Sequence, residues 1–278
     1  MKIAIQGEPG SFSHEAAVNM VAHATIVPCS LSADVFGALA QGAVEAAVIP
    51  IENSLAGSVL EHFDLLLAHD VKVVREIQLR IRHNLIANSG ASVAGIDRVF
   101  SHPVALAQCR RFLAAHPRME ALAFYDTAGS VKQLIERRDQ KAAAIASEAA
   151  ALYYGAQILE RGIEDNPENF TRFFLIRRTA DAVNDPESNK ISLAFSVDNR
   201  PGSLVAALSE LSRQGTNLTK IESRPVHGKP WEYIFYVDAQ LQSSSEGSGA
   251  IEALRPHCSM VKELGRYREA PQKGSTGA

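Results

Sequence analysis

The stretch VKVVREIQLRIRHNLIA, residues 71–87, decides how the chain is built, because much of it alternates apolar and polar residues with period two. Such alternation is typical of a strand and not of a helix. We expect one long strand that leaves one lobe and enters another, so that the chain folds as two lobes sharing crossing segments. The cleft between two such lobes is a common place for a small ligand to bind.

Short apolar runs alternate with helical patterns from the start of the chain to about Arg178. Each run ends in polar residues, glycine or proline, and a helical pattern follows it. The strands predicted in this way are 2–6, 46–51, 98–101 and 142–146. Alternating strands and helices predict α/β lobes in which helices join parallel strands.

A second domain follows a polar segment that is rich in turn-forming residues. The segment TADAVNDPESN, 179–189, has no periodic apolar pattern, so we interpret it as a linker. Residues 190–268 show the order strand, helix, strand, strand, helix, strand, which is the ferredoxin-like arrangement of an α+β domain. The prediction is therefore a two-lobed domain with a central cleft over 1–178, a second domain over 190–268, and a flexible tail over 269–278.

The composition excludes several classes of partner and site. With 28 basic and 31 acidic residues the net charge is -3, so we expect no nucleic-acid partner. No apolar segment reaches the roughly 18 residues of a membrane span, and the first residues, MKIAIQGEPGS, lack a signal-peptide pattern. We expect a cytoplasmic protein with no membrane partner. The three cysteines lie far apart and the nine histidines show no ligand spacing, so we expect no disulfide framework and no metal site.

Two motifs place polar residues where a strand passes into a helix. GEPGSFSHEAA, 7–17, follows the first predicted strand, and Ser11 can cap a helix whose free N–H groups suit an anionic ligand. IPIENSLAGSV, 49–59, puts Asn53 and Ser54 beyond the carboxyl end of another strand, where open α/β sheets bind ligands. Each motif by itself also fits an ordinary turn with capping side chains.

Two further motifs supply hydroxyl, amide and guanidinium groups. SHPVALAQCRRFL begins at Ser101 with the end of a strand, continues into a helix and contains Gln108. NPENFTRFFLIRR has Thr171 and Arg172 at the start of an apolar strand, so a hydroxyl donor and a fixed cation could enter the cleft together. Taken singly, Gln108 also fits a surface position, and Thr171 with Arg172 also fits a strand edge paired with a carboxylate.

All the motifs together closely resemble those of one enzyme family. GEPGSFS, PIENS, SHP followed by Gln108, and NFTRF occur in this order, and PGSL and IESRP follow them. The chain is similar over nearly its whole length to prephenate dehydratases with a C-terminal ACT regulatory domain. This resemblance implies a two-lobed catalytic domain like the periplasmic binding proteins, followed by a ferredoxin-like ACT domain. It also implies conversion of prephenate to phenylpyruvate, water and carbon dioxide, toward L-phenylalanine, without a cofactor or metal.

The resemblance also implies roles for particular residues. The catalytic residues that it implies are Thr171, Asn53, Ser101 and Gln108. The residues expected to bind substrate are Arg172, as the cation for a carboxylate, Ser11 and Ser54. The residues expected to bind L-phenylalanine as an allosteric effector are Gly202, Ser203, Leu204, Glu222, Ser223, Arg224 and Pro225. Ser203 stands where the family pattern has alanine, which is a change from one small residue to another.

Several alternatives stay open at this level. An arogenate dehydratase, whose substrate has an amino group in place of the keto group, would share nearly every motif. A non-catalytic amino-acid sensor could combine the same two folds, but the sequence has no pattern of an output module, and Thr171 would have no purpose there.

Thr171 could relay a proton or act mainly by hydrogen bonding. Because ACT domains usually pair across subunits, we expect a homodimer or a dimer of dimers.

Overall fold

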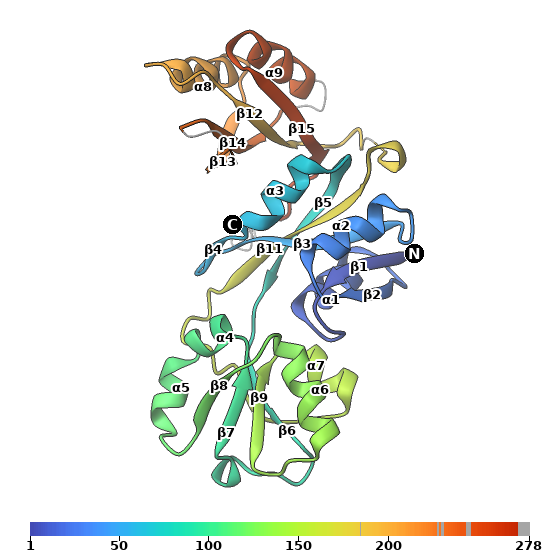
Figure 1. Cartoon of the computed structure of the whole chain (residues 1–278), viewed down its shortest axis with the longest axis vertical. Coiled ribbons are helices and arrows are strands. Elements are labelled where there is room, and N and C mark those ends of the chain that lie inside the picture. Colours follow the sequence, from blue (N-terminus) through green and yellow to red (C-terminus); the bar gives the residue numbers. More distant parts are fainter. Residues whose placement is uncertain (184, 227, 229–230, 243–245, 272–278) are drawn as a thin grey trace, which may run out of the picture. The chain divides into compact units, whose positions relative to one another are not determined.

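The computed structural model describes residues 1–183, 185–226, 228, 231–242 and 246–271. It divides into two compact units, which Figure 1 shows as one continuous chain. Unit 1 contains Met1–Val59 and Gln78–Phe173, whereas unit 2 contains Leu60–Ile77 and the residues from Phe174 onward. The boundaries fall within two strands, β5 (Val71–Arg80) and β11 (Phe170–Arg178), so these strands run through both units. The sequence predicted instead two domains separated by a linker at 179–189. That division differs from these two units, and it stays a prediction.

The first sheet of unit 1 has two buried apolar strands, β1 (Lys2–Gln6) and β3 (Ala46–Asn53), and a more exposed edge strand, β2 (Thr25–Cys29). β1 lies between β2 and β3 and is parallel to both. The helices α1 (Phe12–Met20) and α2 (Ser32–Ala40) pack against these strands. A parallel strand covered on both faces is a continuous apolar run in the sequence, and for this reason β1 and β3 could be predicted.

The second sheet of unit 1 mixes parallel and antiparallel strands. Its order is β10 (Gln157–Arg161), β6 (Asn84–Ala87), β9 (Ala142–Ala146), β7 (Arg98–Ser101) and β8 (Glu120–Ala123). β7 is parallel to β8 and β9, as predicted for strands joined by helices. β6 is antiparallel to β9 and to β10, which the sequence did not indicate.

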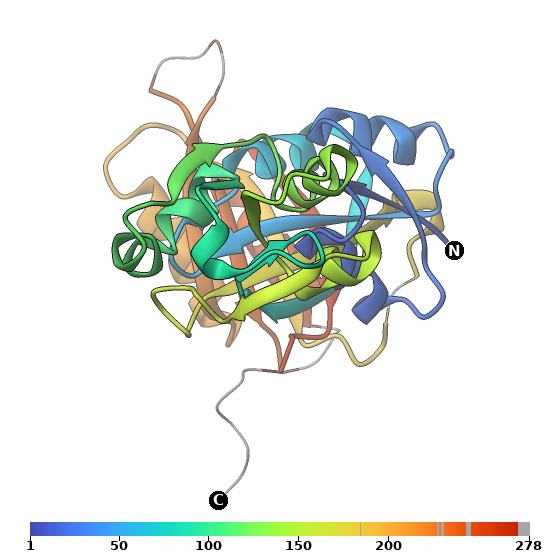
Figure 2. The same ribbon diagram turned by 90° about the horizontal axis from the view of Figure 1, so that it is seen from below.

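Helices cover both faces of this second sheet (Figures 1 and 2). α4 (Pro103–Ala107) and α5 (Arg110–Ala115) pack on one face, against Ala143 and Ile145 of β9. α6 (Thr127–Arg137) and α7 (Glu148–Tyr154) pack on the other face, against the alternate residues of the same strand. Because both faces are covered, β9 is a run of five fully enclosed small and apolar residues.

The predicted long strand over 71–87 is two strands that belong to different sheets. β5 ends at Arg80, and β6 starts at Asn84. The connection between them pairs with the loop before β11 instead of with a strand: Ile81 N–H donates to the carbonyl of Asn169 at 2.7 Å. The stretch therefore does cross from one sheet to the other, but the strand breaks at the crossing.

Four strands were not predicted: the two-residue β4 (Gly57–Ser58), which pairs with the end of β3, and three strands at sheet edges. β2 is the last strand of the first sheet, while β8 and β10 are the two outer strands of the second sheet. Their residues are mostly half-buried or exposed. An edge strand with little burial has no continuous apolar run, so its sequence lacks the signal that identified β1, β3, β7 and β9.

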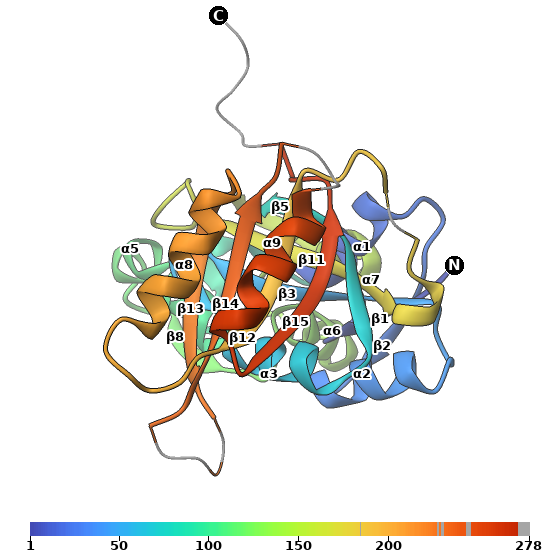
Figure 3. The same cartoon turned by 90° about the horizontal axis from the view of Figure 1, so that it is seen from above.

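The C-terminal part of unit 2 has the predicted ferredoxin-like order. Its elements are β12 (Lys190–Ser196), α8 (Ser203–Arg213), β13 (Asn217–Pro225), β14 (Tyr233–Gln240), α9 (Glu246–Leu254) and β15 (Met260–Tyr267). β12 pairs antiparallel with β14 and β15, and β13 is the edge strand beside β14. α8 and α9 lie next to each other on one face of the sheet (Figure 3). The predicted fold class, two α/β lobes followed by an α+β domain, is confirmed.

The helix α3 (Leu60–Ala68) belongs to unit 2 together with the first part of β5. The ammonium group of Lys262, on β15, donates to the carbonyls of Leu66, Leu67 and His69 at 2.7–3.0 Å. These carbonyls lie at the carboxyl end of α3, where helical carbonyls lack partners and a cation is favourable. Short 3-10 helices lie at Val93–Gly95, Thr179–Asp181 and Arg255–His257.

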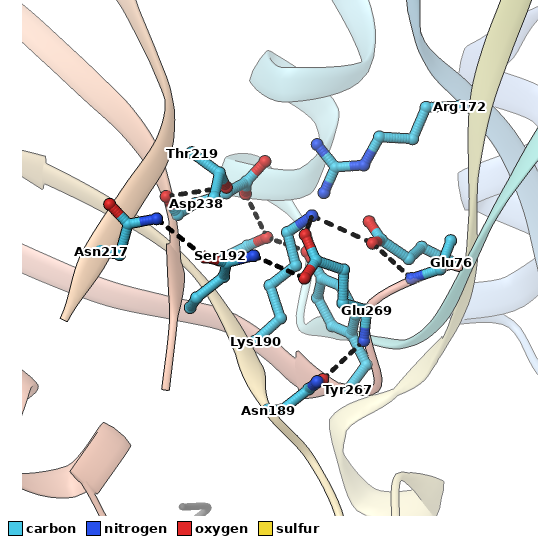
Figure 4. Close-up of polar contacts among 12 residues, drawn as sticks. Glu76, Arg172, Asn189, Lys190, Ser192, Asn217, Thr219, Asp238, Tyr267 and Glu269 are labelled. Atoms are coloured by element: carbon cyan, nitrogen blue, oxygen red, sulfur yellow. Dashed lines mark hydrogen bonds and ion pairs between the residues drawn. The ribbon is translucent and has the colours of Figure 1, made fainter. Parts of the chain in front are cut away.

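A buried polar cluster joins β5, β12 and the residues after β15 (Figure 4). The ammonium group of Lys190 lies 3.0 Å from the carboxylate of Glu76 and 3.3 Å from that of Glu269. The N–H of Ala270 donates to Glu76 at 2.9 Å, and Ala270 is buried. The predicted flexible tail over 269–278 is thus corrected at its start, since these contacts hold Glu269 and Ala270. Residues 272–278 of that tail lie outside the described residues.

We expect Glu76→Ala to destabilise the protein strongly. Removing this carboxylate leaves a buried cation with weaker compensation and an N–H without its acceptor, which costs about 3–5 kcal/mol. Urea unfolding measures the effect. The control Glu187→Ala removes an exposed partner of Arg268 and should cost less than about 1 kcal/mol. Equal losses in the two variants would contradict a structural role for the buried cluster.

Candidate active site

Unit 1 contains a cavity of about 960 Å³ whose walls come from both of its sheets. The first sheet contributes the ends of β1 and β3 and the start of α1, and the second sheet contributes the starts of α4 and α6. The crossing segment at 81–83 and the start of β11 complete the lining. The cavity therefore lies where strands end and helices begin, as expected for a ligand site in an α/β protein.

Thr171 and Asn53 meet in the wall of this cavity. Thr171 is the second residue of β11, and Asn53 is the last residue of β3. The amide nitrogen Nδ2 of Asn53 lies 2.9 Å from Oγ1 of Thr171 and donates to it. Because the Thr171 oxygen accepts this bond, its hydroxyl proton remains available as a donor toward the cavity.

A chain of amide side chains continues from this pair. Asn53 Nδ2 also donates to Oδ1 of Asn169 at 2.7 Å. Asn169 Nδ2 in turn donates to Oε1 of Gln108 at 2.9 Å. Asn169 is fully buried, while Gln108 and Asn53 line the cavity. Three predicted residues, Thr171, Asn53 and Gln108, are thus brought together, and Asn169 joins them.

His83 ends this chain of hydrogen bonds. Its Nε2 lies 2.9 Å from Oε1 of Gln108, and its ring packs edge-on against Phe12 with 5.7 Å between the ring centroids. Burial lowers the pKa of His83 below its usual value, more than the bond to Gln108 and the nearby Glu164 raise it. His83 is therefore a neutral imidazole at neutral pH.

Two helix N-termini face the cavity, and an acidic side chain caps one of them. Ser11 caps α1, where its hydroxyl oxygen accepts from the N–H of His14 at 3.3 Å, and Ser11 lines the cavity as predicted. Asp126 caps α6 and accepts from Gly129 N–H at 2.7 Å, and burial raises the pKa of its carboxyl. Helix N-termini carry partial positive charge and stabilise anions.

The lysine of the cavity is paired. The ammonium of Lys132, on α6, lies 3.1 Å from a carboxylate oxygen of Glu8, and the phenol of Tyr125 donates to the other oxygen at 3.0 Å. All three side chains line the cavity. Lys132 would therefore meet an anionic ligand as part of a polar group, not as an isolated charge.

Ser101 and Ser54 do not face the cavity. Ser101 is fully buried at the end of β7, and its hydroxyl donates to the carbonyl of Ile145 at 2.6 Å. The hydroxyl of Ser54 donates to the carbonyl of Glu168 at 3.1 Å and accepts from Phe170 N–H at 3.0 Å. Ser54 thus holds the backbone just before Thr171, and Ser101 holds β9, while a direct contact of either serine with substrate stays a prediction.

Arg172 also lies outside the cavity lining. Successive residues of a strand point to opposite faces, so Thr171 and Phe173 face the cavity and Arg172 faces away from it. The Arg172 guanidinium is buried, 3.9 Å from the carboxylate of Glu52. This geometry does not support the expectation that Arg172 holds a substrate carboxylate, and that role stays a prediction.

His83 and Asn169 were missed by the sequence reasoning. Asn169 is within the NFTRF motif, two residues before Thr171, and the period of two along a strand was a signal that the two residues share a face. His83 lies in the crossing segment, and its partner Gln108 is 25 residues away. No local pattern in the sequence indicates that pairing.

The residues predicted to bind L-phenylalanine lie in unit 2 on two elements. Gly202 precedes α8 with a φ of 86°, a left-handed conformation that favours glycine, and Ser203 and Leu204 start the helix. The segment Glu222–Pro225, with Ser223 and Arg224 inside it, ends the edge strand β13. The Arg224 guanidinium pairs with the carboxylate of Asp64 at 3.2 Å.

Family models match both parts of the chain. The prephenate dehydratase model matches residues 3–181, and the ACT domain model matches residues 191–246. The chain belongs to the prephenate dehydratase family. Among curated relatives of this family, the bifunctional chorismate mutase/prephenate dehydratase of Aquifex aeolicus is 37% identical, over 97% of this chain and 74% of the relative. The Arabidopsis thaliana arogenate dehydratase/prephenate dehydratase 2 is also 37% identical, over 96% of this chain and 72% of the relative.

Two solved structures resemble the whole chain. Prephenate dehydratase from Arthrobacter aurescens, in complex with L-Phe, has a TM-score of 0.87 and 28% identity, covering 97% of this chain and 90% of that one. GqqA, described as a novel type of quorum quenching acylase, has a TM-score of 0.89 and 31% identity, covering 98% of this chain and 100% of that one.

A membrane-spanning helix and a cluster of metal-ligating side chains are both absent from the described residues. No described helix of this prephenate dehydratase family member is long and apolar enough to cross a membrane. Within the same residues, no three side chains of His, Cys, Asp or Glu gather as they would around a metal ion.

We expect His83 to make the stability of the protein depend on pH. Because its pKa is lowered in the folded state, the unfolded chain binds a proton first as the pH falls through about 6.5, and the free energy of unfolding falls with it. His83→Gln should remove this part of the pH dependence. Urea unfolding of both proteins between pH 7 and pH 5 measures the difference in slope, and identical slopes would contradict a neutral buried imidazole.

Proposed function

We propose that the protein is a prephenate dehydratase, which converts prephenate to phenylpyruvate, water and carbon dioxide. The observation that carries the proposal is the pairing of Thr171 with Asn53 in a cavity of a chain whose residues 3–181 match this family. The proposal extends to a catalytic domain over 1–178 and a regulatory domain over 190–268.

The chemistry requires binding of a dianion and help for a leaving hydroxyl group. As the ring carboxylate leaves as carbon dioxide, its electron pair enters the ring, and the hydroxyl group at the opposite ring carbon departs as water after taking one proton. The product ring is aromatic, so the driving force is in the substrate and the proposed reaction uses no cofactor. The protein must therefore hold two carboxylates and stabilise the charge that develops on the departing oxygen.

Thr171 is placed for the second task. Its oxygen accepts from Asn53, so its proton points away from that amide and can be donated to the departing hydroxyl. A fixed donor aimed at developing charge is worth about 3–4 kcal/mol in a site without bulk water. For the first task, the N-terminus of α1 and the Gln108 amide are the groups that favour carboxylates.

Amide hydrolysis is the second candidate function, because one similar structure is described as an acylase. Hydrolysis by a threonine nucleophile needs a base that takes the hydroxyl proton. In the described structure the partner of Thr171 Oγ1 is an amide that donates, and an amide nitrogen cannot act as a base. This arrangement favours a hydrogen-bonding role for Thr171 over a nucleophilic one.

The deciding experiment is incubation of the purified protein with prephenate, with arogenate and with an N-acyl amide in separate reactions. Phenylpyruvate and one carbon dioxide per prephenate consumed are the expected products. Phenylalanine formed faster from arogenate would assign the protein as an arogenate dehydratase, as two of its plant relatives are named. Turnover of the amide alone would overturn the proposal.

Thr171→Val should lower kcat by about a hundred- to a thousandfold while KM changes little. The valine keeps the shape of the side chain and removes its hydroxyl. Thr171→Ser, the control, keeps the hydroxyl and should retain most of the turnover. Steady-state assays with prephenate measure both. A valine variant within a few-fold of the parent would remove Thr171 from the chemistry.

The regulatory part of the proposal is inhibition by L-phenylalanine, bound by Gly202, Ser203 and Leu204 together with Glu222–Pro225. A Cβ on Gly202 would meet no other atom within 4 Å, so this end of α8 has open space for a ligand. Its helical N–H groups suit a carboxylate. A coupling of about 1–3 kcal/mol between effector and substrate sites is the usual scale.

The assembly and the location are also part of the proposal. β13 is an edge strand, and Ile221 in it is half exposed. Because an unpaired edge is a template for pairing with another chain, we propose a homodimer or a dimer of dimers built on this sheet. The three cysteines are free thiols, as in a reducing compartment, and we propose a cytoplasmic location.

Gly202→Val should raise the L-phenylalanine concentration needed for half-maximal inhibition by about tenfold or more. The substitution forces a side chain into a left-handed conformation and into the space left for the ligand. Gly215→Val is the matched control, because Gly215 follows the other end of α8 with a φ of 76°. Inhibition curves, each referred to the turnover of that variant without effector, measure the shift. Equal shifts in both variants would contradict the assignment.

A further inference from the structure

The orientation of three linked amides, those of Asn53, Asn169 and Gln108, follows from two backbone groups. The N–H groups of Leu55 and Ala56 donate to one atom of the Asn53 carboxamide, at 3.0 and 2.8 Å. A backbone N–H can only donate, so that atom is the oxygen, Oδ1. Nδ2 of Asn53 therefore faces Asn169 and Thr171.

The same logic passes along the chain of hydrogen bonds. Since Asn53 donates, the atom of Asn169 that faces it is Oδ1, and the other end of Asn169 is a donor. That donor faces Gln108, whose facing atom must then be Oε1. His83 contacts the same Oε1, so Nε2 of His83 must carry the proton. In a neutral imidazole, Nδ1 is then unprotonated.

The amide nitrogen of Gln108 is the free end of this chain. The oxygen of Gln108 accepts from His83 and Asn169, each at 2.9 Å. Among the described residues, no hydrogen-bond acceptor lies against its Nε2. Gln108 lines the cavity. With the oxygen held from two sides, the NH₂ group is the part of the amide that remains for a ligand. The opposite orientation would present a carbonyl oxygen, which repels a carboxylate.

We propose that His83 and Asn169 are positioning residues that hold Gln108 so that its NH₂ group binds a carboxylate of the substrate. This inference rests on the proposed function, because it takes the substrate to be a dianion. The two ends of the hydrogen-bonded chain, the Thr171 hydroxyl and the Gln108 amide, are then both donors. His83 acts through Gln108 and needs no contact with the reacting atoms.

Asn169→Asp tests the inference most sharply. An aspartate oxygen replaces the donor that faces Gln108, so the Gln108 amide turns and presents its carbonyl oxygen to the substrate. KM for prephenate should rise by about ten- to a hundredfold, the scale of a lost hydrogen bond to a charged group, with a smaller change in kcat. Asn166→Asp, in the same loop, is the matched control, since Asn166 contacts the N–H of Glu168 through its oxygen and is absent from the cavity lining.

A double-variant cycle separates positioning from simple charge repulsion. If Asn169→Asp acts through Gln108, its effect on KM should largely disappear in a Gln108→Ala background. A full effect in that background would show that the new charge acts directly on the substrate, and would overturn the inference.

A second pair of variants covers the case in which Asn169→Asp does not fold. His83→Leu removes one of the two donors to Gln108, whereas His83→Gln supplies an amide donor from nearly the same place. KM should rise in the leucine variant and return to within a few-fold of the parent value in the glutamine variant. Equal KM values in the leucine variant and the parent would overturn the role of His83.

Nitrogen NMR of the histidine rings tests the network without any assay. His83 should be neutral with its proton on Nε2, and a proton on Nδ1 would overturn the proposed orientation of Gln108. If the parent protein turned over neither prephenate nor arogenate, the proposed function would fail while this NMR result still stood. The two failures are therefore distinguishable.

Discussion

The geometry of the cavity wall depends on the carboxamide of Asn53. Two backbone N–H groups in the turn after β3 hold its oxygen, and its nitrogen then fixes both the hydroxyl of Thr171 and the buried amide of Asn169. Burying an amide with one end unsatisfied costs about 1–3 kcal/mol. The folded protein is therefore most stable when every amide of this hydrogen-bonded series has its partners. This one turn thereby determines how the Thr171 hydroxyl and the Gln108 amide face the cavity, and both groups are hydrogen-bond donors.

Two chain segments that contain site residues continue into unit 2. β5 contains Glu76, held by Lys190 in the buried cluster, and the chain continues through the crossing segment to His83. β11 starts with Thr171 in the cavity wall and continues beyond Phe173 into unit 2. Under the proposed regulation, a change in unit 2 would have two chain segments along which to reach the cavity, and a two-state rearrangement of these segments is the physical requirement.

Much of the fold could be predicted, and the errors have physical causes. The buried strands β1, β3, β7 and β9 were identified by their apolar runs, whereas the exposed edge strands had no such signal. Polar residues at strand ends indicated Thr171 and Asn53, and the structure brings these two side chains together in the cavity wall. Arg172 was expected in the cavity because it follows Thr171 in the sequence. Successive residues of a strand point to opposite faces, however, and Arg172 does not line the cavity. His83 was missed because its role comes from a contact with a residue distant in the sequence.

The most direct test of the account is a crystal structure of the Thr171→Val variant with prephenate bound. The account predicts a carboxylate oxygen within about 3 Å of Nε2 of Gln108, with the ring hydroxyl of the substrate beside residue 171. A dianion bound in the cavity with both carboxylates away from Gln108, or with the Gln108 oxygen turned toward the ligand, would contradict it.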